Sequence, residues 1–191
     1  MKSFTLIEIA VVISIILILS ILAFPNFRDA KAKFALDRTI YKLSQDLRNA
    51  EEMAMSSRAT PPEIFVSSFF PQGGYGLYFQ ENSSSYILFA DCDGDKKYDT
   101  AEGLPMANSC SEATNIRPYP EKFKEIPLEA GIKIGTLNPK YSQDNSLAIT
   151  FFPPDPTITI YPAASTAFIT LIFKTKSETA SINLNGLIEI Q

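Results

Sequence analysis

The chain has 191 residues, of which 46% are hydrophobic and 20% charged, and its formal net charge is −4 at pH 7. It contains no histidine, so the commonest general base, the serine or cysteine triad and most transition-metal sites are missing. A sequence pI near 4.9 argues against a nucleic-acid surface, which usually carries a basic patch. We therefore expect neither an enzyme nor a nucleic-acid partner.

An apolar run from Phe4 to Phe24 contains one charge, Glu8. About 20 residues of helix span about 30 Å, the thickness of a bilayer core. A carboxylate costs roughly 2.5 to 3.5 kcal/mol at the middle of such a helix and less near its end, so it is rarely present without a partner or a task. Two alternatives stay open: Glu8 snorkels to a membrane surface, or the run is a cleavable export signal with Lys2 as its basic start.

Helical periodicity continues beyond the apolar run. Pro25 ends that run and is expected to kink the helix, because proline removes a hydrogen bond and clashes with the preceding turn. We predict one helix over about 4–56, apolar on all sides at first and amphipathic from residue 25 onward. Its apolar stripe follows steps of three and four: Leu36, Ile40, Leu43, Leu47, Ala50 and Ala54.

The string Phe4-Thr5-Leu6-Ile7-Glu8, the apolar segment behind it and Pro25 resemble the amino-terminal region of type IV pilins and pseudopilins. The resemblance implies that a prepilin peptidase cuts between Ser3 and Phe4 and methylates the new amino group. The family usually has glycine where this chain has Ser3. The resemblance also implies that Glu8 pairs with the amino group of Phe4 on a neighbouring subunit, which would offset the desolvation of the carboxylate.

The same resemblance implies partners and a location. The partners would be other pilin or pseudopilin subunits, the peptidase and an inner-membrane assembly platform. The chain would be a single-pass inner-membrane protein with an exterior carboxyl-terminal domain, later part of a pilus or pseudopilus. The basic residues Arg28, Lys31, Lys33 and Arg38 taken alone indicate the opposite orientation, but long domains are translocated with little regard to local charge.

Residues 57–191 are of single-domain size and read as strands separated by turns. Asn185-Gly186 predicts a hairpin with a two-residue type I′ turn between Ser181–Leu184 and Leu187–Ile190. The expected fold is α+β, a long helix packed on an antiparallel sheet, with segments 1–3 (leader), 4–24 (membrane and assembly helix), 25–56 (amphipathic half) and 57–191 (exterior domain). The expected strands are 64–70, 75–80, 86–90, 132–137, 147–152, 157–161, 167–174 and 181–190.

Two further stretches indicate a more specific resemblance within this family. Tyr86–Asp91, which leads into an acidic turn, and the closing strand with Asn185-Gly186 are similar to minor pseudopilins or minor pilins of the GspH/FimT type. This implies a minor subunit of a type IV pilus or of a type II secretion pseudopilus.

The acidic turn itself suggests a second chemistry. Oxygen-bearing side chains fall at places 1, 3, 5, 9 and 12 of a calcium loop, where hard ligands suit Ca²⁺. Lys96 holds the sixth place, where such loops have glycine. A plain solvated turn, in which short polar side chains cap their own backbone, is the alternative. The residues concerned are Asp91, Asp93, Asp95, Asp99 and Glu102.

Cys92 and Cys110 are the two cysteines of the chain. In an exported domain they predict a disulfide, which would stabilise the fold by about 3 kcal/mol on the chain-entropy estimate. Two separate thiols are the alternative. Taken together, the sequence predicts a filament subunit that assembles through its amino-terminal helix. The rival hypothesis is a signal-anchored exterior β domain that binds calcium or a ligand and forms no filament.

Overall fold

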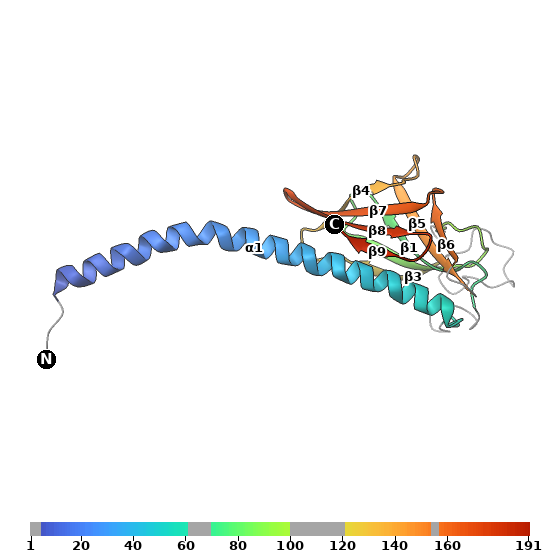
Figure 1. The fold of residues 1–191 in the computed structure, drawn as a ribbon, viewed down its shortest axis with the longest axis horizontal. Helices are drawn as coiled ribbons and strands as arrows, with labels where there is room; N and C mark the ends of the chain where they lie inside the picture. The colour runs from blue at the N-terminus through green and yellow to red at the C-terminus, as the bar shows by residue number, and fades with distance from the viewer. Residues whose placement is uncertain (1–4, 61–69, 100–120, 154–156) are drawn as a thin grey trace. The chain divides into compact units, whose positions relative to one another are not determined.

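The computed structural model describes residues 5–60, 70–99, 121–153 and 157–191, with the side chains of 22–29 excepted. The chain divides into two compact units, one ending at Ala35 and one spanning Leu36–Gln191. The described residues form one helix, α1, and two antiparallel sheets, so the predicted α+β class is confirmed (Figure 1).

Helix α1 spans Leu6–Met55, close to the predicted bounds, and its backbone is helical through position 25. It ends in a Schellman motif. Ser57 has a positive φ of 49°, and the N–H of Arg58 donates to the carbonyl of Met53 at 3.0 Å. The kink at Pro25 stays a prediction.

The carboxyl-terminal part of α1, from Leu36 onward, carries one buried stripe. Its predicted stripe residues are all 0–1% exposed, whereas Lys42 and Arg48 on the other side are exposed. Burying one leucine-sized side chain contributes about 1.5–3 kcal/mol, so this stripe is a large part of what holds the helix to the sheets. The stripe comprises Leu36, Ile40, Leu43, Leu47, Ala50 and Ala54.

The first sheet has five strands in the order β3-β2-β1-β5-β6. On β1, alternate residues such as Leu77 and Phe79 are fully buried, as are Ile149 and Phe151 on the neighbouring β5. Side chains alternate between the two faces of a strand, so one face of this sheet forms the core. The strands are β1 Gly74–Gln80, β2 Ser85–Asp91, β3 Lys122–Pro127, β5 Ser146–Phe152 and β6 Thr157–Tyr161.

The second sheet has four strands in the order β4-β7-β8-β9. The turn between β1 and β2 joins the two sheets, because the N–H of Asn82 donates to the carbonyl of Ile134 at 2.8 Å and the N–H of Ile134 donates to the carbonyl of Ser83 at 2.9 Å. The strands are β4 Lys133–Asn138, β7 Thr166–Phe173, β8 Lys176–Asn183 and β9 Ile188–Ile190.

Side-chain contacts also hold the part of α1 from Leu36 onward against the strands and their connections. The hydroxyl of Tyr86 on β2 donates to the carboxylate of Asp46, and burial together with this acceptor raises the pKa of the tyrosine. Arg38 forms two hydrogen bonds with Glu129, at 2.5 and 2.6 Å. The part of α1 from Leu36 onward therefore forms one layer of the second unit, as the ribbon shows (Figure 1).

Most predicted strands are confirmed, but the arrangement differs in three respects. The strands form two sheets, not one. Strand β3 lies where no strand was predicted, and β8 begins at Lys176, well before the predicted start at Ser181. Phe70 belongs to no strand, and the rest of the strand predicted over 64–70 lies outside the described residues.

The hairpin at Asn185-Gly186 exists, but its predicted turn type is wrong. Only Gly186 has a positive φ, 81°, and its N–H donates to the carbonyl of Asn183 at 3.0 Å. Ile182 pairs with Ile188, and the N–H of Asn183 donates to the carbonyl of Leu187 at 3.2 Å, so the three residues between Asn183 and Leu187 form the loop. This is the type I turn followed by a left-handed glycine that three-residue hairpin loops favour.

Candidate functional site

The start of α1 is closed by a reciprocal cap between Thr5 and Glu8. The N–H of Thr5 donates to Oε2 of Glu8 at 3.3 Å, and the N–H of Glu8 donates to Oγ1 of Thr5 at 3.4 Å. Thr5 is thus the N-cap and Glu8 the third helical residue of a capping box. The carboxylate also lies at the positive end of the helix dipole, which favours a negative charge.

Beyond this cap, the helix surface over Leu6–Ile21 is apolar. The large apolar side chains there are 51–88% exposed within the chain, and Glu8 is the one charged residue among them. The hydroxyls of Ser14 and Ser20 donate to carbonyls of the helix backbone at 2.8 Å. Because their donors are used within the helix, these serines add little polarity to its surface. An exposed apolar surface of this extent marks a contact with another apolar surface.

Within the described residues, the structure contains no helix with the length and apolarity that a membrane crossing requires.

The remaining predicted assembly residues are only partly described. Ser3 and Phe4, the expected cleavage and methylation site, lie outside the described residues. Pro25 has a helical backbone, and its side chain is not described. The expected pairing of Glu8 with an amino group stays a prediction.

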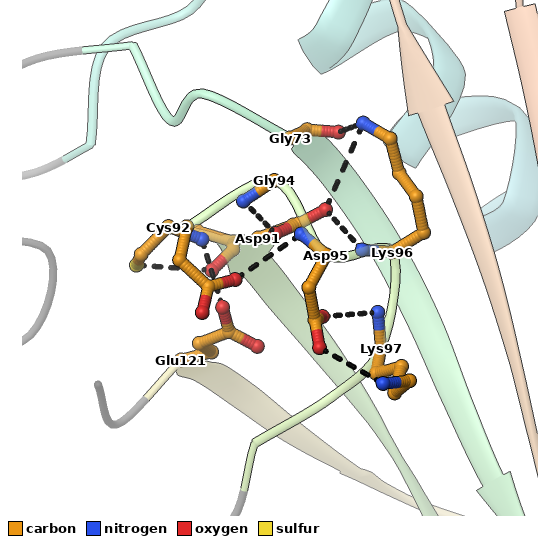
Figure 2. A network of polar contacts seen from close by, with 10 residues as sticks. Gly73, Asp91, Cys92, Gly94, Asp95, Lys96, Lys97 and Glu121 are labelled. Atoms are coloured by element: carbon orange, nitrogen blue, oxygen red, sulfur yellow. Dashed lines mark hydrogen bonds and ion pairs between the residues drawn. The ribbon is translucent and has the colours of Figure 1, made fainter. Parts of the chain in front are cut away.

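A second candidate site is the acidic turn after β2, organised around the buried carboxylate of Asp91 (Figure 2). Its Oδ1 accepts the N–H of Gly94 at 2.8 Å and its Oδ2 accepts the N–H of Lys96 at 3.1 Å. Burial raises the pKa of Asp91 to about 6, although these donors and the Lys96 ammonium group, 3.9 Å away, act to lower it.

Glu121 joins this turn from the start of the β3 segment (Figure 2). It is 1% exposed, and its carboxylate accepts the N–H groups of Cys92 at 2.8 Å and of Asp99 at 3.0 Å. Burial raises the pKa of Glu121 to about 9, which outweighs the lowering effect of the two donors. The residue therefore ties the two ends of the turn together.

The carboxylates of the turn form two groups whose oxygens lie within 4.8 Å of one another: Asp91 with Asp93 and Glu121, and Asp93 with Asp95 and Asp99. These are hard ligands of the type that Ca²⁺ takes. The predicted calcium set is thus partly brought together, with Glu121 added, while Glu102 lies outside the described residues.

The turn also supplies its own cations and donors. Lys97 pairs with Asp95 at 3.3 Å, and its N–H donates to the same carboxylate at 2.8 Å. Lys96 adopts a positive φ of 69° and donates to the carbonyl of Gly73 at 3.3 Å. Such bonds are those of a self-capped turn. Calcium binding stays a prediction that the structure does not test.

Cys92, next to Asp91, forms a disulfide. Cys110 is the other cysteine of the chain and lies outside the described residues, so the pairing of Cys92 with Cys110 stays a prediction.

Sequence reasoning missed three residues of these sites. The pattern Thr-x-x-Glu before an apolar run was a readable signal for the cap at Thr5. Gly73 lets the buried carboxylate approach the backbone, because a Cβ there would lie 1.8 Å from Oδ2 of Asp91. Glu121 had no local signal, because it reaches the turn only through the pairing of β3 with β2.

Comparisons with protein-family models, with curated proteins and with solved structures give no significant match.

Proposed function

We propose that the chain is a structural subunit, a minor pilin or pseudopilin, of a type IV pilus or a type II secretion pseudopilus. The observation that carries this proposal is the exposed apolar helix surface over Leu6–Ile21, in which Glu8 is the one charged residue. Packing against the equivalent helices of neighbouring subunits would cover that surface. The predicted membrane anchor would hold the subunit before assembly.

Glu8 would set the register of that packing. In a bundle of apolar helices the carboxylate loses its water, and an amino group on the adjacent subunit would compensate for the loss. The predicted donor is the amino group of Phe4 after removal of residues 1–3. Because the cap to Thr5 leaves the carboxylate exposed, it remains accessible to such a cation.

The processing state of the purified protein tests the proposal. The full chain is co-expressed with a prepilin peptidase, and the product is analysed by intact mass and amino-terminal sequencing. We expect loss of residues 1–3 and a methylated Phe4. A Ser3→Gly variant, which restores the usual residue of the family, should be processed at least as fully. An amino terminus beyond Ala23 would instead show a cleaved export signal and contradict the proposal.

The rival function is a signal-anchored exterior domain that binds calcium or a ligand. The two groups of clustered carboxylates in the acidic turn favour it. It predicts an intact Met1 in the same measurement, and no filament.

A further inference from the structure

A groove lies between residues 41–48 of α1 and the edge strand β9. None of the sites described above includes it. It has a volume of about 530 Å³, within the roughly 300–1,000 Å³ typical of ligand sites. Its helical wall repeats at steps of three and four, so these residues form one face of α1. The groove is lined by Tyr41, Ser44, Gln45, Arg48, Ile188 and Ile190.

The strand side of the groove presents unused backbone groups. Thr179 and Gln191 exchange two backbone hydrogen bonds, at 3.0 and 2.8 Å. Hydrogen-bonded and non-hydrogen-bonded pairs alternate along an antiparallel ladder, so Ile190 and Ile188 occupy non-hydrogen-bonded positions opposite β8. Their N–H and C=O groups therefore point away from β8, toward the open edge of the sheet.

No described residue satisfies these four groups. Strand β9 is the last strand of its sheet, and outside the β8–β9 ladder no hydrogen bond joins the backbone of Ile188 or Ile190 to another described residue. Such an edge is a template for one more strand. Ile188 and Ile190 are half-buried, and Tyr41 is 65% exposed. Their side chains supply apolar contacts beside this edge.

The charge of the groove indicates the chemistry of the occupant. Arg48 is the one charged residue among the six that line it, and it forms no ion pair with a described acid. Glu189 does not neutralise it from within the groove, because its side chain lies on the opposite face of β9 from its two neighbours. A carboxylate on the incoming strand would complete the pairing.

We propose that this groove binds an extended, acidic segment of another protein, which adds as a fifth strand beside β9 and pairs a carboxylate with Arg48. A second copy of the chain is the poorer candidate. In an antiparallel pair of two β9 strands, Glu189 of the second copy would lie on the face of the sheet away from Arg48. Of the other described edge strands, β4 and β6 have no acidic residue, and β3 contains two lysines beside its glutamate. The inference does not depend on filament assembly.

The test uses the full chain in detergent micelles and a phage-displayed library of random nine-residue peptides. We expect enrichment of peptides that contain Asp or Glu between β-branched or aromatic residues. A fluorescein-labelled enriched peptide should bind with an anisotropy change that Arg48→Glu weakens at least tenfold. Replacing the acidic residue of the peptide by lysine should restore its binding to that variant.

Two further variants separate strand addition from simple charge attraction. Ile190→Pro removes an N–H that faces the groove and is not needed by the β8 ladder, so it should abolish binding while circular dichroism stays unchanged. Glu189→Ala, on the other face, should leave binding within twofold of wild type. No enrichment, or binding that both Arg48→Glu and Ile190→Pro leave unchanged, would overturn the proposal. Self-association of the chain that Ile190→Pro abolishes would assign the groove to a second copy and also overturn it.

Discussion

At the scale of single residues, Glu8 combines an observed role with a proposed one. In the isolated chain it caps the first turn of α1 together with Thr5. In the proposed filament it would pair with an amino group of a neighbour. A cap needs a hydrogen-bond acceptor at this position, which glutamine also provides, whereas an ion pair needs the charge.

Glu8→Gln and Glu8→Ala therefore distinguish the two roles. If pairing governs assembly, both variants should enter sheared filaments poorly, because each leaves the partner cation buried alone at a cost of about 3 to 5 kcal/mol. Incorporation is measured by quantitative immunoblotting of filament and membrane fractions. Normal incorporation of Glu8→Gln beside poor incorporation of Glu8→Ala would reduce the role of Glu8 to the cap.

A second residue-scale property is the pH dependence of the acidic turn. Folding raises the pKa of Asp91 to about 6 and that of Glu121 to about 9, both above the ordinary values of free carboxyls. The folded state therefore binds more protons than the unfolded state, so this stabilisation is complete in acid and is lost as the pH rises through these two values.

We accordingly expect the Tm of wild type to fall between pH 5 and pH 9. Glu121→Gln cannot ionise, so its Tm should fall less over the same range, by a difference of at least about 3 °C. Thermal scans by circular dichroism at one-unit steps of pH measure this. The exposed Glu52→Gln serves as the control and should follow wild type. If the Tm of wild type and that of Glu121→Gln fall equally with pH, folding does not change the pKa of Glu121.

At the scale of elements, the buried stripe holds the part of α1 from Leu36 onward against the sheets. Leu43 is 0% exposed, so Leu43→Ala should lower the free energy of unfolding by about 2–5 kcal/mol, because it removes apolar contacts and leaves a cavity. Urea unfolding can be followed by tyrosine fluorescence, since the chain has 8 tyrosines and no tryptophan. Asn49→Ala, on the exposed side of the helix, should change the free energy of unfolding by less than about 0.5 kcal/mol. Equal effects of the two variants would contradict the assigned packing face.

The hairpin between β8 and β9 shows a limit of prediction from local sequence. Asn-Gly correctly predicts an antiparallel hairpin, but the observed pairing of Ile182 with Ile188 differs by one residue from the register of a two-residue turn. A one-residue slip exchanges the faces of a strand. The observed register places Ile182 in the core, where it is fully buried, so packing overrode the local preference of the turn.

At the scale of the whole molecule, the acidic turn follows β2 and bears on the choice between a filament subunit and a calcium-binding domain. Lys96 and Lys97 already lie against the carboxylates, and both oxygens of Asp91 are hydrogen-bonded. We therefore expect 1 mM CaCl₂ to change the Tm of the full chain by less than about 1 °C relative to EGTA. A saturable rise in Tm that Asp93→Asn removes would favour the calcium-binding function, because a ligand that binds only the folded state stabilises it.

The amino-acid sequence by itself determined the local elements: the long helix, its buried stripe and most strands. Apolar periodicity and turn residues act over a few neighbouring positions, so they can be read without the fold. The tertiary structure alone decided how the strands divide into two sheets, which register β9 takes and that Glu121 meets Asp91. These features depend on contacts between residues far apart in the chain, whose energies no local pattern contains.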